Sequence, residues 1–139
     1  MRQTTRGLTL LELLLAAAIM GVVLSAMLQL FLKCNLLVMA NRDLSVAVAH
    51  VQYVMEEIKN TNFADIWTKI AVDHQWDWNS ATINAKGLAA LHDESIDTEV
   101  SNKAVSGTNL WDISVTANWK DRTGTGGDRS ITLETLISQ

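Results

Sequence analysis

The residues that could carry out chemistry are few and widely separated. The three histidines, His50, His74 and His92, lie at no helical ligand spacing from one another or from the single cysteine, Cys34. The glycine-rich segment 123–127 lacks the Gly-Lys-Ser/Thr of a phosphate loop, and no serine occupies a nucleophile-elbow context. The sequence therefore predicts no catalytic residue, no metal site and no cofactor, and it argues against an enzyme.

One local group combines acids with aromatic rings: Asp73, His74, Trp76, Asp77 and Trp78. Two tryptophans one residue apart can stack on a sugar or contact a partner protein, and the flanking acids can bind calcium. Tryptophans at such a place can equally fill the gap between a loop and a sheet. The sequence leaves these interpretations open.

The most unusual charged residue is Glu12, because it lies in an apolar segment. Within residues 8–32 the only other side chains with polar groups are Thr9, Ser25 and Gln29. As a helix this segment would be about 37 Å long, enough to cross a hydrocarbon core of about 30 Å. A carboxylate inside the bilayer costs about 2.5 to 3.5 kcal/mol. Either Glu12 lies close to the interface, or a partner charge comes from another chain.

The segment around Glu12 resembles a known family. A short basic leader ends at Gly7, and Leu-Thr-Leu-Leu-Glu and an unbroken apolar helix follow. This arrangement resembles the prepilin N-terminus of type IV pilins and type II secretion pseudopilins. The resemblance implies cleavage between Gly7 and Leu8 by a prepilin peptidase and N-methylation of Leu8. It also makes Glu12 the fifth residue of the mature chain and the carboxylate used in subunit assembly. The family's usual first residue is Phe, from which Leu8 departs.

The implied cleavage gives Glu12 a partner. The new α-amino group of Leu8 can neutralise the Glu12 carboxylate of a neighbouring subunit in lipid. Within one helix the two groups are about one turn apart, so pairing inside a single chain is the competing interpretation. An ordinary secretory signal with its small-residue cleavage site at alanines 16–18 is a further alternative. The glutamate and the apolar run beyond Ala18 count against it.

The charge distribution indicates topology. From Lys33 onward, nine Lys and Arg stand against fourteen Asp and Glu, which argues against a nucleic-acid surface. The leader carries Arg2 and Arg6 without an acid. We therefore expect a cytoplasmic N-terminus at the inner membrane and a periplasmic C-terminal part.

The apolar pattern continues beyond the span. Apolar residues recur at steps of three and four from Ala40 through Val51 to Ile58, with polar residues between them. Since the chain has no proline, we predict one helix over residues 9–60. His50 lies next to this apolar stripe and is predicted to be a residue at its border.

Gly21 and Cys34 are single residues of their kind in this helix. Glycine lowers helix propensity by about 1 kcal/mol relative to alanine, so Gly21 is the predicted weak point of the helix. A close helix contact at the missing side chain is an equal alternative. Cys34 has no intramolecular disulfide partner. It is interpreted as a small apolar helix residue, with an intermolecular bridge or acylation as alternatives.

The rest of the chain is predicted to form a small sheet. Residues 111–119 and 129–137 alternate between apolar and polar, which predicts a β-hairpin whose apolar face covers the helix. Before the hairpin, we expect a short helix over residues 63–72, a helical turn or two over 85–92 and a strand within 95–105. The predicted layout is a leader (1–7), a transmembrane half (8–33) and an amphipathic half (34–60) of the long helix, and a periplasmic globular part (61–139) with a variable connection (61–109) and a terminal β-hairpin (110–138).

Together these features predict an α+β protein with a pilin-like fold. The resemblance implies a structural subunit, most simply a minor pilin or minor pseudopilin, that assembles through its hydrophobic helix into a type IV pilus or a type II secretion pseudopilus. Its partners would be the prepilin peptidase, other pilin or pseudopilin subunits, the inner-membrane assembly platform and the lipid bilayer. The alternative is a signal-anchored periplasmic binding domain that does not polymerise.

Overall fold

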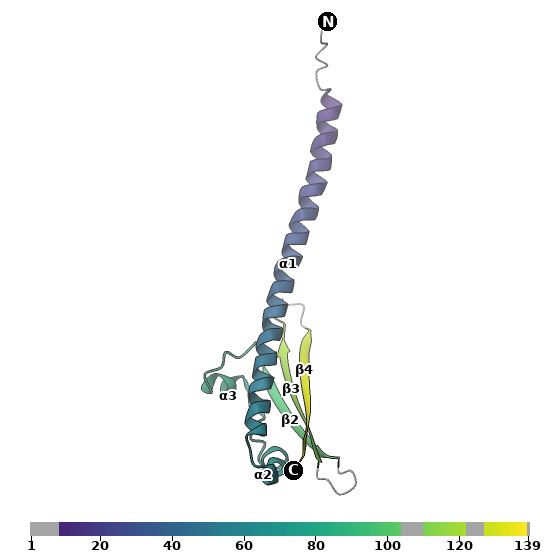
Figure 1. Cartoon of the computed structure of the whole chain (residues 1–139). Helices are drawn as coiled ribbons and strands as arrows, with labels where there is room; N and C mark the ends of the chain where they lie inside the picture. The colour runs from purple at the N-terminus through teal and green to yellow at the C-terminus, as the bar shows by residue number, and fades with distance from the viewer. Residues whose placement is uncertain (1–8, 104–109, 122–126, 139) are drawn as a thin grey trace. The chain divides into compact units, whose positions relative to one another are not determined.

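The computed structural model describes residues 9–103, 110–121 and 127–138, and it divides into two units at Met39 and Ala40. Predicted features at Gly7, Leu8 and the glycine-rich turn 123–126 lie outside the described residues. Figure 1 shows the elements. In chain order they are α1 (Leu10–Lys59), α2 (Phe63–Ala71), β1 (Trp78–Asn79), α3 (Ser80–Ala85), β2 (Ser95–Asn102), β3 (Leu110–Lys120) and β4 (Asp128–Ser138).

The predicted long helix is confirmed as α1. It begins at Leu10 and ends at Lys59, one residue inside each predicted bound. In the first unit every described side chain is exposed, whereas in the second unit α1 turns one apolar face inward. The buried residues of that face recur at steps of three and four, as the sequence pattern requires: Ala47, His50, Val51, Val54, Met55 and Ile58.

The segment after α1 is held by side-chain caps. The predicted helix over residues 63–72 is confirmed as α2, where the Asn62 side chain accepts a hydrogen bond from the Ala64 amide. The prediction of a helical turn over residues 85–92 was wrong. The helix there is α3, which begins earlier because the Asn79 side chain caps it, and it ends before Gly87, whose φ of +80° a helix cannot continue.

The strands form one antiparallel sheet in the order β1-β2-β3-β4. The predicted strand within residues 95–105 is confirmed as β2. The predicted hairpin is confirmed as β3 and β4, which pair at every position from Leu110↔Ser138 to Lys120↔Asp128. The fold is therefore α+β, with a long helix against a four-stranded antiparallel sheet, as in pilins.

The core lies between the sheet and the second half of α1. On β3 the alternate residues Ile113, Val115, Ala117 and Trp119 are buried, and they share one cluster with the buried face of α1. The intervening residues of β3 are partly exposed on the other face of the sheet. The apolar face of the hairpin therefore covers the stripe of the helix, as predicted.

Candidate functional site

The described start of α1 has the hydrogen bonds of a helix cap. The Glu12 amide donates to the Thr9 carbonyl oxygen at 3.0 Å and lies 3.3 Å from the Thr9 hydroxyl, and the Leu13 amide also donates to the Thr9 carbonyl. Thr and Glu three residues apart are the signature of a capping box, and an acid in the first turn interacts favourably with the helix dipole. This cap at Thr9 was not predicted, although the Thr9-x-x-Glu12 spacing was a signal for it.

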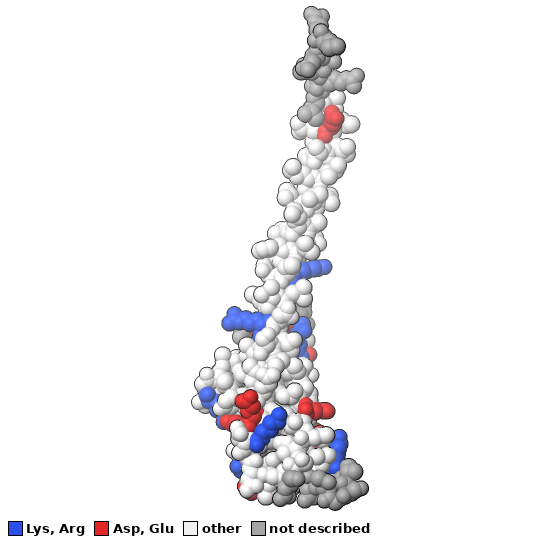
Figure 2. All heavy atoms as spheres, viewed as in Figure 1, with Lys and Arg blue, Asp and Glu red and all other residues white. Residues whose placement is uncertain are grey.

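The Glu12 carboxylate is exposed and has no hydrogen bond or ion pair with any described residue. It is also the only charged side chain from Leu10 to Leu32. Figure 2 shows the contrast between the nearly uncoloured surface of the apolar helix and the charges gathered over the second unit. The carboxylate is thus available to a partner outside this chain.

The apolar side chains around Glu12 are exposed on all sides of the helix. A helix that is apolar all round needs a lipid or a helical bundle as its surroundings. Within the described part of the chain, α1 alone has the length and apolar composition for a membrane span.

Gly21 lies in a shallow groove on one face of α1. The helix continues through Gly21 without a break, and a Cβ built there would meet nothing within 4 Å. The Ser25 hydroxyl donates a hydrogen bond of 2.8 Å to the Gly21 carbonyl oxygen, which satisfies this polar side chain within the helix. Small and polar residues one turn apart line the groove: Ala18, Gly21, Val22, Ser25, Ala26 and Gln29.

In the second unit, the two tryptophans of the acid-rich group are part of the core. Trp76 and Trp78 are buried, so they fill the space between loop and sheet and cannot stack on a sugar. The Trp76 indole donates to a Glu57 carboxylate oxygen at 3.0 Å, and Lys86 lies 4.3 Å from the centre of a Trp78 ring. Of the open interpretations, the structure therefore favours the structural one.

One acid of that group, Asp77, is used within the fold. One Asp77 oxygen accepts hydrogen bonds from the amide and hydroxyl of Thr98, and the other lies 2.6 Å from the His74 ring nitrogen. The described residues contain no group of three or more His, Cys, Asp or Glu side chains that could hold a metal ion. Cys34 is a free, exposed thiol on α1.

The prediction that His50 lies at the border of the apolar stripe was wrong. His50 is buried, and its Nδ1 atom lies 2.8 Å from the Glu94 carboxylate, which is also buried. The second Glu94 oxygen accepts the Leu91 amide at 2.7 Å. This pair joins α1 to the segment before β2, and the helical pattern alone contains no sign of a partner 44 residues away.

Exposed ion pairs flank the sheet. The Lys120 ammonium donates a hydrogen bond to Asp93 and lowers the pKa of that carboxyl below its ordinary value, with a smaller charge effect from His92. Asp112 likewise raises the pKa of Lys103. These pairs lie on the surface of the second unit.

Comparison with known proteins concerns the N-terminal segment. A family model described as the prokaryotic N-terminal methylation motif matches residues 2–28, a segment that contains Gly7, Leu8, Glu12 and Gly21. Searches of curated proteins and of solved structures found no match. The motif implies processing by a prepilin peptidase. The chain thus has the N-terminal methylation motif found in type IV pilins and pseudopilins, and its α+β fold is pilin-like.

Proposed function

We propose that this protein is a structural subunit, a minor pilin or minor pseudopilin, of a type IV pilus or a type II secretion pseudopilus. In this proposal the peptidase cuts between Gly7 and Leu8, the new amino terminus at Leu8 is methylated, and the mature chain enters a filament through α1. The single observation that carries the proposal is Glu12, an exposed carboxylate without a described partner at the head of an apolar helix.

The electrostatic argument links processing to assembly. An unpaired carboxylate in the bilayer costs about 2.5 to 3.5 kcal/mol, and an unpaired amine is similarly unfavourable. Cleavage creates the amine at Leu8, and contact with Glu12 of a neighbouring subunit offsets both costs. An uncut chain has no amine at this position, so only a processed subunit can form the pair.

The groove at Gly21 supports contact between helices. Small residues allow two helix backbones to approach closely in lipid, where packing rather than water exclusion drives association. The groove has small residues at four of its six positions, Ala18, Gly21, Ser25 and Ala26. In the proposed filament this face packs against a neighbouring subunit, and Gly21 is the place where the helix would yield if packing requires it.

The proposed topology follows the predicted layout. Residues 1–7 are the cytoplasmic leader, 8–33 the transmembrane half of the helix, 34–60 its amphipathic half and 61–139 the periplasmic part, with the connection at 61–109 and the hairpin at 110–138. The partners are the prepilin peptidase, other pilin or pseudopilin subunits, the inner-membrane assembly platform and the lipid bilayer. The function is structural rather than enzymatic.

Processing is tested by mass. The protein is expressed with and without a prepilin peptidase, and the intact mass is measured. We expect loss of the segment MRQTTRG and gain of one methyl group only when the peptidase is present. An unchanged mass in a host that processes a known prepilin would remove the proposal.

Assembly is tested by two substitutions of Glu12. Glu12→Ala removes both the charge and the length of the side chain, whereas Glu12→Gln keeps the side-chain length and a hydrogen-bonding group but removes the charge. We expect normal cleavage of both variants and incorporation into filaments reduced at least about tenfold for both. Wild-type incorporation of Glu12→Gln would refute charge pairing. Cleavage without incorporation of the wild type would favour the anchored, non-polymerising alternative.

A further inference from the structure

The sheet ends in a long regular edge at β4. This strand pairs with β3 at all of its positions, and the strand order places it last, so its other edge meets no described strand. Edge strands usually avoid further pairing by being short or by carrying proline, lysine or a bulge. β4 has no proline, lysine or bulge in its 11 residues, and its inner-face charge, Arg129, lies near its start, before Leu133 and Glu134.

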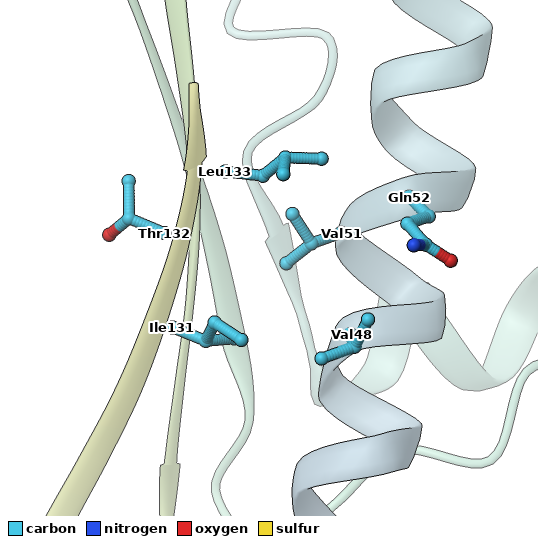
Figure 3. Close-up of a pocket in the computed structure, with 6 residues that line it drawn as sticks. All are labelled: Val48, Val51, Gln52, Ile131, Thr132 and Leu133. Carbon is cyan, nitrogen blue, oxygen red and sulfur yellow. The ribbon is translucent and has the colours of Figure 1, made fainter. Parts of the chain in front are cut away.

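An apolar groove follows this edge on the side of α1. A cavity of about 40 Å³ lies between β4 and the helix, lined by Val48, Val51, Gln52, Ile131, Thr132 and Leu133. In Figure 3, Ile131 and Leu133 point from β4 toward α1, and Thr132 points to the opposite side of the sheet. Leu133 is 38% exposed, whereas its cross-strand partner Val115 is 0% exposed. The helix therefore covers β3 and leaves the inner face of the edge strand partly open.

The opposite face of the same edge is acidic. Glu99, Ser114 and Glu134 form one row across β2, β3 and β4. They line a polar hollow together with Asp112 and Ser101, and the Asp112 carboxylate is paired with Lys103. A strand added at the edge of β4 would extend this row by one residue, which would lie directly beside Glu134.

We propose that the free edge of β4 binds an extended segment of a different protein, which joins the sheet as a further strand. The backbone of that segment pairs with β4, a small apolar side chain enters the groove at Leu133, and a Lys or Arg lies beside Glu134. In such strand addition, main-chain hydrogen bonds supply affinity and alternate side chains supply specificity. This surface lies in the second unit, so the proposal does not depend on N-terminal processing.

A second copy of β4 has no cation to place opposite Glu134. Residues that oppose each other across a continued sheet share a face, so the residue opposite Glu134 must come from the outer face of the added strand. The outer-face residues of β4 are Asp128, Ser130, Thr132, Glu134, Leu136 and Ser138, none of which is a cation. The one cation of β4, Arg129, pairs in register with the buried Trp119 and lies on the inner face.

The edge at the other end of the sheet, formed by β1 and β2, is also an unfavourable partner for β4 of a second copy. β1 pairs only with Ser95 and Ile96 of β2, and farther along the same edge the Asp77 carboxylate accepts the Thr98 amide. The outer face of β2 carries Asp97 and Glu99, which would repel Glu134 if copies joined edge to edge. A different chain can place a small apolar side chain against the inner face of the edge and a basic side chain against its outer face.

The test uses the full-length chain in detergent micelles and a synthetic peptide, Thr-Val-Thr-Val-Lys-Val-Thr-Val-Thr. Alternate amides of the peptide are N-methylated along one edge so that it cannot stack on itself. Amide hydrogen exchange of β4 is followed by NMR during titration. We expect saturable slowing of exchange for the amides that point away from β3, while the amides paired with β3 exchange as before and serve as an internal control for folding.

A charge reversal tests specificity. A second peptide has Glu in place of Lys. We expect the wild type to prefer the Lys peptide and Glu134→Lys to prefer the Glu peptide, each by about threefold to tenfold. Glu56→Lys makes the same charge change at an exposed position on α1 and should keep the wild-type preference. Leu133→Lys should weaken the binding of both peptides, because the charge of the new side chain would occupy the apolar groove.

Three results would overturn the proposal. One is no slowing of exchange at the outward amides of β4 with either peptide. Another is an equal loss of preference in Glu134→Lys and Glu56→Lys, which would show that only net charge matters. The third is concentration-dependent slowing of exchange at β4 without any peptide, which would identify a second copy of the chain as the occupant.

Discussion

Substitution of Glu94 should lower the free energy of unfolding more than substitution of most other residues. Its carboxylate is buried and makes two contacts, with His50 at 2.8 Å and with the Leu91 amide at 2.7 Å. Glu94→Ala leaves two buried groups without their partner, and each unsatisfied group costs about 1 to 3 kcal/mol. Breaking a buried pair by removal of one member costs about 3 to 5 kcal/mol in general. We therefore expect the free energy of unfolding to fall by about 3 to 5 kcal/mol.

Glu94→Gln distinguishes the effect of the lost hydrogen bonds from the effect of the lost side-chain volume in Glu94→Ala. The amide has the same shape, its oxygen can accept the Leu91 amide, and its nitrogen can donate to a neutral His50 ring. We expect a smaller cost, of about 1 to 2 kcal/mol. In a double-mutant cycle with His50→Ala, the second substitution should cost much less than the first, because the interaction has already been lost.

The assay is chemical denaturation of the full chain in micelles, followed by tryptophan fluorescence. All five tryptophans lie in the second unit, so the signal reports on the fold that contains the pair. Glu99→Ala, an exposed carboxylate on β2, is the matched control and should change stability by less than about 0.5 kcal/mol. A cost for Glu94→Ala no larger than that of the control would refute the reasoning.

Two further predictions concern the helix and the surface. Gly21→Ala should slow amide exchange in the adjacent turns of the isolated chain, since the added Cβ meets nothing within 4 Å and alanine favours the helix by about 1 kcal/mol; faster exchange would contradict this. Lys120→Gln should raise the pKa of Asp93 toward its ordinary value in an NMR titration. Because the folded pKa of Asp93 is lowered, its pair with Lys120 favours the folded state above the unfolded pKa and loses this effect as the pH falls through the folded pKa. A pKa of Asp93 unchanged by the substitution would exclude Lys120 as the cause.

Long repetitive patterns made much of this fold predictable. The steps of three and four along α1 and the alternation along β3 repeat over enough residues to fix both the element and its buried face. α3 was not predictable in the same way, since six residues are too few to display a helical period. Its position depends on one cap at Asn79 and one positive φ at Gly87, which are single-residue signals.

Contacts between distant segments were the main feature that the sequence did not reveal. His50 meets Glu94 across 44 residues, and Trp76 meets Glu57 across 19. A polar residue next to an apolar stripe has the same local pattern whether its partner is water or a buried carboxylate, so only the packed fold distinguishes the two. For Glu12 the local pattern was informative, but the cap that Thr9 provides became evident only from its hydrogen bonds.

The core of the second unit begins at Ala47, with the partly buried Val46 packed against it, and no residue from Leu10 to Met39 belongs to it. Exchange of one apolar residue for another between Leu10 and Met39 therefore leaves every contact of that core intact, and selection there acts through whatever surrounds the helix. Beyond Ala47, selection acts through the sheet. One uninterrupted helix should thus accumulate substitutions under two separate sets of constraints, and homologues that diverge in one half need not diverge in the other.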